Sequence, residues 1–73
     1  MVTAKVILNR RTESGEGENR AVTLAFNADY ADGRNKEWAV ATPALSLTMT
    51  VKGPVAERFQ EGERYTLAFT PED

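Results

Sequence analysis

The sequence of 73 residues contains no cysteine and no histidine. Without cysteine, the chain can form neither a disulfide bond nor a thiolate metal site, which support many very small domains. Without histidine, it lacks the side chain that most often serves as general base or metal ligand. A chain of this length buries only about 60% of its unfolded surface. We therefore expect a single small domain over residues 1–73, without linkers, that gains stability as a homo-oligomer.

Long apolar runs and an excess of positive charge are also missing. A membrane-spanning helix needs about 20 consecutive apolar residues, and the apolar runs of this chain are far shorter. Residues 1–5 lack the apolar core of a signal peptide. The net charge is −2 and the pI is near 5.1, which disfavours binding of duplex nucleic acid through a basic face. These features predict a cytoplasmic protein that binds neither membranes nor duplex nucleic acid.

Alternation of apolar and polar residues predicts the strands. It runs over residues 2–9, where Arg10 and Arg11 close the first strand, and again over residues 20–30, 45–52 and 64–69. The polar segment 12–19 is expected to be a mobile loop between two strands of an antiparallel hairpin. Pro54 favours a short helix over residues 54–60, with Val55 and Phe59 on its apolar side. The expected fold is mainly β, in the order β-β-β-short α-β, forming a small curled sheet or incomplete barrel similar to OB or SH3 barrels.

Catalytic and metal-binding patterns are weak. Glu13, Glu16 and Glu18 lie in the expected polar loop, where solvent screens them, so no carboxylate has the apolar surroundings that acid–base chemistry needs. Asp29 and Asp32 lack the spacing of a calcium-binding loop. We expect a protein that is not an enzyme and that has no metal or cofactor.

The segment 35–43 is expected to be an ordered extended loop rather than a helix, because the residue before Pro43 favours extended geometry, and it is the strongest candidate for a binding site. It contains Trp38, the single tryptophan, among polar and charged neighbours. Two interpretations stay open: Trp38 is a core or lid residue, or its ring stacks on a base while nearby cations hold a phosphate. Arg10 and Arg11 join this site if the fold brings the end of the first strand to the same rim. The candidate ligand-binding residues are Arg10, Arg11, Arg34, Asn35, Lys36, Trp38 and Thr42.

Three patterns resemble a family of small accessory proteins from tailed phages and prophages. They are Asn35-Lys36-x-Trp38, Thr42-Pro43, and Phe59-x-x-Gly62-x-x-Tyr65-x-Leu67-x-Phe69. The sequence departs from that family at Ala44-Leu45, where Ser-Gly is expected, and at residues 60–62, where a Pro-Gly turn is expected. The resemblance implies a phage accessory protein in the host cytoplasm or in the virion. Such proteins include oligomeric sponges for cyclic nucleotide signals, other inhibitors of host defence, and minor virion components.

The residues and the resemblance together predict a non-catalytic homo-oligomer that sequesters a small anionic ligand of the cyclic nucleotide type. Two alternatives remain. The protein is a minor capsid or tail component that docks onto a larger assembly, or it inhibits a host defence factor by binding that protein directly.

Overall fold

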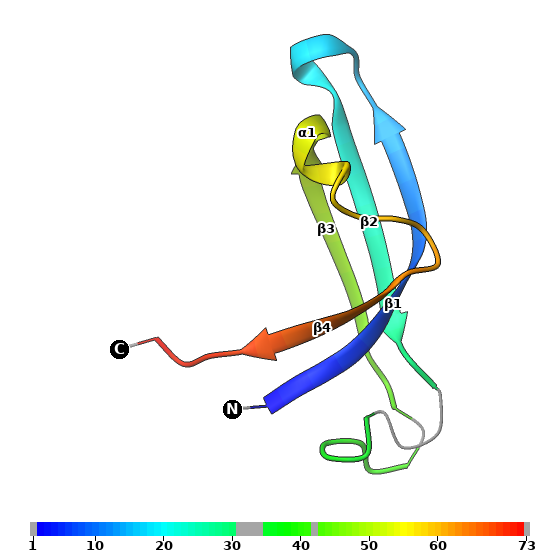
Figure 1. The fold of residues 1–73 in the computed structure, drawn as a ribbon, viewed down its shortest axis with the longest axis vertical. Helices are drawn as coiled ribbons and strands as arrows, with labels where there is room; N and C mark the ends of the chain where they lie inside the picture. The colour runs from blue at the N-terminus through cyan, green and yellow to red at the C-terminus, as the bar shows by residue number, and fades with distance from the viewer. Residues whose placement is uncertain (1, 31–34, 42, 73) are drawn as a thin grey trace.

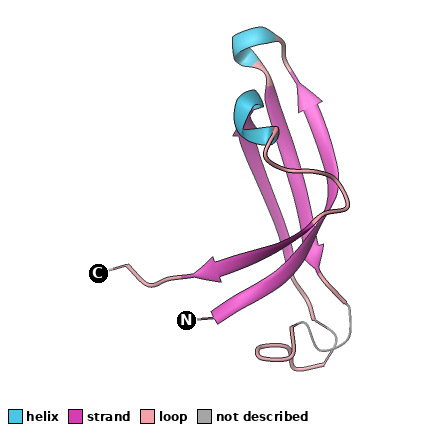
Figure 2. Cartoon of the chain, viewed as in Figure 1, coloured by secondary structure: helices cyan, strands magenta, loops and turns pink. Residues whose placement is uncertain are grey.

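A curled antiparallel sheet of four strands forms the body of the protein and closes only part of the way into a barrel (Figure 1). The computed structural model describes residues 2–30, 35–41 and 43–72. The prediction of a mainly β chain, folded as a small curled sheet or incomplete barrel with one short helix, is confirmed. In chain order the elements are β1 (Val2–Ser14), the 3-10 turn η1 (Gly17–Asn19), β2 (Ala21–Ala28), β3 (Ser46–Lys52), α1 (Gly53–Ala56) and β4 (Arg64–Phe69) (Figure 2).

The strand order in the sheet is β3-β2-β1-β4, and each pair of neighbours is antiparallel. The strands β1 and β2 form the predicted hairpin, in which Ser14 lies opposite Ala21. The last strand returns to the first, so that Val2 lies opposite Phe69. The two strands at the edges of the sheet are therefore β3 and β4.

The first strand continues beyond residue 9, where the predicted alternation ends. The alternation ends there because a β-bulge interrupts the strand. Its pairing with β2 shifts by one residue between Leu8 and Arg10. The extra residue, Asn9, exchanges the two faces of the strand, because successive side chains point to opposite sides of a sheet. Residues with even numbers face the core before the bulge, and residues with odd numbers do so after it. Arg11 consequently lies opposite the buried Leu24.

The segment 12–19 is not the mobile loop that its polarity suggests. Residues 12–14 continue β1 and pair with residues 21–23 of β2, so the prediction is wrong for this part. The connection itself is short and includes η1. The prediction failed because residues 12–14 of β1 are polar on both faces of the strand. A strand without an apolar face cannot be distinguished from a polar loop by its sequence.

The concave inner face of the sheet carries the core, and α1 covers one end of it (Figure 1). Ala56 of α1 is fully buried there. The ring of Phe59, which follows α1, lies 6.0 Å from the ring of Phe26 and 5.3 Å from that of Tyr65, measured between centroids. The buried core residues are Val6, Leu8, Val22, Leu24, Phe26 and Ala56.

The helix differs from the prediction in length and in the residue that it buries. It spans only Gly53–Ala56, because the backbone N–H groups of Arg58 and Phe59 bond to carbonyls three residues earlier and end the α-helical pattern. Val55, expected on the apolar side, is exposed, and Ala56 takes its place. Phe59 packs against the core as predicted.

The segment 35–43 was expected to be extended, and this is wrong for its first part. The backbone N–H groups of Trp38 and Ala39 both donate to the carbonyl of Asn35, at 3.3 and 3.0 Å. These bonds close a compact turn over residues 35–39 beside the end of β2.

We predict that Gly15→Ala destabilises the fold more than Gly17→Ala does. Both glycines have positive φ, +77° and +56°, so alanine costs about 1–2 kcal/mol at either position. At Gly15 the added Cβ would also lie 2.3 Å from the carbonyl oxygen of Asn19, whereas at Gly17 it would meet nothing within 4 Å. We expect Gly15→Ala to lower the free energy of unfolding by at least about 1 kcal/mol more, measured by urea denaturation. Equal losses would contradict this account of the turn.

Candidate functional site

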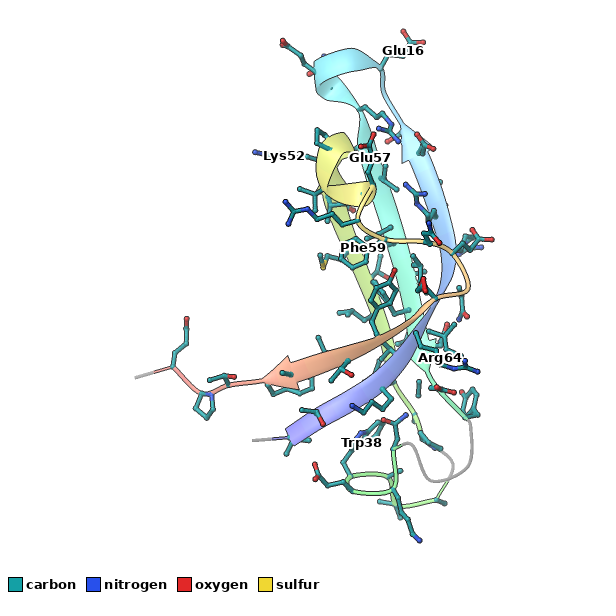
Figure 3. The ribbon with its side chains drawn as sticks, viewed as in Figure 1. Glu16, Trp38, Lys52, Glu57, Phe59 and Arg64 are labelled. Atoms are coloured by element: carbon teal, nitrogen blue, oxygen red, sulfur yellow. The ribbon has the colours of Figure 1, made fainter. Side chains whose placement is uncertain are left out.

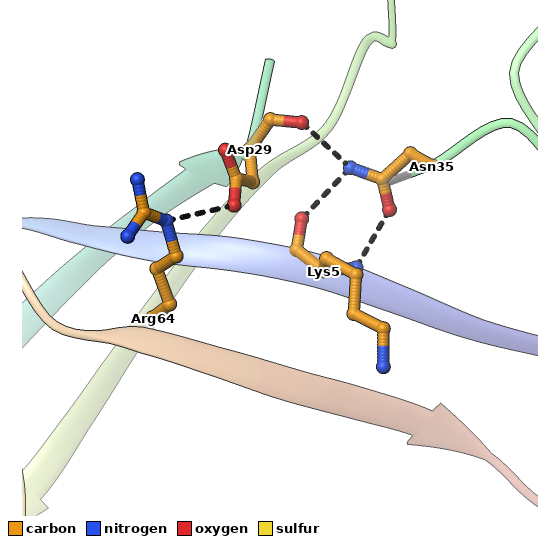
Figure 4. A network of polar contacts seen from close by, with 4 residues as sticks. All are labelled: Lys5, Asp29, Asn35 and Arg64. Carbon is orange, nitrogen blue, oxygen red and sulfur yellow. Dashed lines mark hydrogen bonds and ion pairs between the residues drawn. The ribbon is translucent and has the colours of Figure 1, made fainter. Parts of the chain in front are cut away.

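The side chain of Asn35 occupies the end of the hydrogen-bond ladder between β1 and β2 (Figure 4). Its Oδ1 accepts a hydrogen bond from the backbone N–H of Lys5 at 2.6 Å. Its Nδ2 donates to the backbone carbonyls of Lys5 and Asp29, at 2.8 and 3.0 Å. The N–H of Asp29 donates to the same Lys5 carbonyl at 2.9 Å. Lys5 and Asp29 are therefore joined directly by one bond and through the Asn35 carboxamide by others.

This carboxamide has little capacity left for a ligand. Trp38 Nε1 also donates to its Oδ1, at 3.2 Å, so both acceptor positions and both donor positions are used. Asn35 is only 2% exposed. The structure thus gives Asn35 a role in joining the turn to the sheet, which the sequence did not reveal. To hydrogen-bond a ligand, the Asn35 side chain would have to break these bonds.

Trp38 lies at the end of the sheet opposite α1 (Figure 3). It is half-buried, which fits the interpretation of Trp38 as a lid residue. Part of the Trp38 side chain remains accessible to solvent. Trp38 lines a small apolar recess of about 230 Å³ together with Val2, Ala4, Leu45 and Phe69.

Two of the predicted cations, Arg10 and Arg11, lie far from Trp38. Arg10 and Arg11 lie five and six residues beyond Lys5 on β1, which separates them from the Asn35 turn by about 17–20 Å. They also point to opposite faces of the sheet, because they are adjacent on one strand. The Nε atom of Arg11 is buried and has no hydrogen-bond partner among the described residues.

Of the other predicted site residues, Lys36 is exposed in the turn beside Trp38. Arg34 and Thr42 lie outside the described residues. The prediction of a site for an anionic ligand therefore stays a prediction, with Lys36 as the described cation nearest in sequence to Trp38.

Two ion pairs stabilise opposite ends of the sheet. Arg20 Nε donates to Glu13 Oε1 at 2.7 Å, and this hydrogen bond lowers the pKa of the exposed Glu13 carboxyl. Arg64 Nε contacts Asp29 Oδ2 at 3.1 Å, and Asp29 is almost fully buried (Figure 4). A carboxyl with a lowered pKa holds its proton weakly, so Glu13 is poorly suited to act as a general acid near neutral pH.

A surface that the sequence did not single out lies on the concave side of the sheet, away from α1. It combines exposed side chains of β1, β3 and β4 with half-buried neighbours, and none of them is charged. We call it the open inner face, and it consists of Val2, Leu45, Leu47, Met49, Leu67 and Phe69.

The open inner face is substantially exposed. The exposed fractions of Val2, Met49 and Phe69 are 46%, 40% and 53%. In the sequence these positions alternate with polar residues as those of a buried face do, and alternation alone cannot distinguish a covered face from an open one. One signal in the sequence could have indicated this surface. The chain has four predicted strands with apolar faces but only one short predicted helix to cover them.

The edge strand β3 has backbone groups beside this face that bond to no other strand among the described residues. The N–H of Ala28 bonds to the carbonyl of Leu45, and the N–H of Gly53 bonds to the carbonyl of Arg20. Because hydrogen bonding alternates along an antiparallel pair, residues with odd numbers in β3 bond to β2. The backbone groups of Ser46, Thr48 and Thr50 therefore point to the side where β3 has no neighbouring strand in the sheet. Edge strands are usually protected by charges or proline, but β3 contains neither before Lys52.

Within residues 2–30, 35–41 and 43–72, no group of three or more acidic side chains comes together to hold a metal ion. No helix among these residues is long and apolar enough to cross a membrane.

Comparisons with family models, with curated proteins and with solved structures found no match to this chain.

We predict that Asn35→Ala destabilises the fold by about 1–3 kcal/mol, because it leaves the N–H of Lys5 without its partner at the end of the ladder. Asn35→Asp should cost at least as much, since a carboxylate oxygen would replace Nδ2 and face two carbonyl oxygens. Lys36→Ala, at the neighbouring exposed position, is the control and should be nearly neutral. Urea denaturation followed by Trp38 fluorescence measures all three. Similar stability of the Asn35 and Lys36 variants would show that the carboxamide is dispensable.

Proposed function

We propose that the protein is a non-catalytic binding module that holds a segment of a partner protein against its open inner face. The observation that carries the proposal is the position of this uncharged apolar face directly beside the unpaired backbone edge of β3. An extended segment placed there would add a strand to the sheet through Ser46, Thr48 and Thr50. Its alternate side chains would contact Leu47 and Met49. Recognition by strand addition uses backbone bonds for affinity and side-chain pockets for selectivity.

A recess of about 250 Å³ next to β3 suits the side chains of such a segment. It is lined almost entirely by apolar atoms, between Met49 and Leu47 on one edge strand and Leu67 on the other, with Phe59 and Tyr65 at the end nearer α1. Docking of this kind fits two of the functions that the phage resemblance implies, a minor virion component and an inhibitor that binds a host protein. Neither function requires a catalytic group.

A library of displayed 12-residue peptides tests the proposal. We expect selected peptides to alternate apolar and polar residues and to bind with a dissociation constant of about 10 μM or tighter. Binding should slow hydrogen exchange at the amides of Thr48 and Thr50, which point away from β2, far more than at Leu47 and Met49, which already bond to it.

Two variants form a matched pair, in which a glutamate is placed either within the open inner face or outside it. Met49→Glu should weaken peptide binding at least about tenfold, because the peptide would bury an unpaired charge. Val40→Glu introduces the same charge at a fully exposed residue that is not part of the open inner face, and it should leave binding unchanged. Peptides that bind without slowing exchange at Thr48 and Thr50, or equal effects of the two variants, would refute strand addition at β3.

A second candidate function is sequestration of a small anionic ligand of the cyclic nucleotide type. The observation that favours it is the apolar recess where Trp38 and Phe69 supply two aromatic rings and the exposed Lys36 lies two residues from Trp38. A base could stack in the recess while Lys36 meets a phosphate.

For this candidate, titration of the protein with a panel of cyclic dinucleotides and trinucleotides should change Trp38 fluorescence with a dissociation constant below about 10 μM. Lys36→Ala should weaken the binding. Lys52→Ala, which removes a lysine at the opposite end of the sheet beside α1, should not (Figure 3). The absence of any fluorescence change across the panel would exclude this function for the tested ligands.

A further inference from the structure

The protein is unusually thin and extended for its length. Its principal extents are 42, 32 and 16 Å, and the radius of gyration of its Cα atoms is 13.9 Å. A compact domain of 73 residues has a radius of gyration of about 11 Å. Domains usually bury the apolar face of a sheet against a second layer of structure. Among the described residues, α1 and the segment after it supply that layer over one end of the inner face, and the turn that carries Trp38 lies at the other end (Figures 1 and 3).

The accessible surface area of the chain is also larger than that of a compact domain of its size. The chain exposes 5553 Å². A folded monomer with its mass of 8.1 kDa is expected to expose about 4,500 Å². The excess is about 1,000 Å², and each partner in a stable protein complex of standard size buries about 800 Å². The surplus area is therefore enough to form one ordinary protein interface.

The chemistry of the open inner face allows it to contact a copy of itself. In a two-fold dimer the same surface of both subunits meets, so a charged residue close to the axis would lie near its own copy. Val2, Leu45, Leu47, Met49, Leu67 and Phe69 carry no charge, and such a contact creates no repulsion. The chain also has no cysteine and therefore no disulfide bond. Small domains without disulfide bonds often gain their stability by oligomerisation.

We infer that the partner held at the open inner face is a second copy of this chain, with the inner faces of the two subunits packed together about a two-fold axis. This inference rests on the proposed function in its choice of the open inner face as the binding surface, and it does not use strand addition at β3. Each subunit supplies the layer that the other lacks. The pair encloses Met49 and Phe69 of both subunits in a shared core.

Sedimentation equilibrium between about 1 μM and 1 mM tests the inference, a range that covers binding free energies of about −4 to −8 kcal/mol. We expect the wild-type protein to have twice its chain mass of 8.1 kDa at the upper concentrations. Met49→Glu and Phe69→Glu should raise the dissociation constant at least about tenfold, because each buries two unpaired charges per dimer. Both residues are exposed in the single chain, so these variants should retain the fold, as circular dichroism can verify. Val40→Glu should dimerise as the wild type does.

Three outcomes would overturn the dimer. The wild-type protein could have the mass of a single chain throughout the range. The dimer could persist unchanged in both inner-face variants, which would place its interface elsewhere. The Val40→Glu control could dissociate as readily as the other variants, which would make the effect one of net charge.

The dimer and the more general binding function can fail separately. A single-chain mass, combined with peptides that slow exchange at Thr48 and Thr50, would remove the second copy as the partner and keep the binding function. A dimer broken by Met49→Glu and Phe69→Glu, with no peptide binding at β3, would keep the second copy and remove strand addition.

Discussion

The central constraint of the structure is that one strand, β1, must pair with two neighbours along different parts of its length. Residues 2–7 pair with β4, and residues 6–14 pair with β2, so only the middle of β1 has a strand on both sides. The sheet can therefore curl, because its two halves diverge on either side of this overlap. Val6 lies within this overlap and Leu8 directly after it, and both are buried on the inner face. The rest of the chain covers the two ends of this arrangement, with α1 at one end and the Asn35 turn at the other, and leaves the open inner face between them exposed.

Much of this fold could be predicted from local pattern. Alternation located β2, β3 and β4 to within a few residues, because each has one apolar face and none contains a bulge. The pattern failed where geometry depends on partners. The bulge at Asn9 exchanges the faces of β1, so a prediction that follows one fixed period ends the strand too early. The order of the strands was also out of reach, because the pairing of β4 with β1 joins residues that are more than 50 positions apart.

The candidate site shows a similar division. The sequence drew attention to the segment around Trp38, where polar residues surround a large aromatic side chain. It could not show that the Asn35 carboxamide replaces a missing ladder bond, since that role depends on where Lys5 and Asp29 end their own pairing. An asparagine that serves a ligand and one that serves the backbone look identical in sequence. The open inner face was hidden for the opposite reason, because its residues match a core pattern so well.

The bulge at Asn9 has a practical consequence for redesign and for alignment of related sequences. Before it, residues with odd numbers in β1 lie on the outer face, and after it those with even numbers do. Deletion of Asn9 would remove the bulge and leave Arg11 and Glu13 on the inner face, opposite Leu24 and Val22, whereas a deletion elsewhere in the strand would exchange the faces of the residues beyond it. Related proteins that lack the extra residue need a gap at this point, because an alignment without it would match inner positions of one protein with outer positions of the other. For this strand, the position relative to the bulge decides which face of the sheet a side chain lies on, whatever its chemical character.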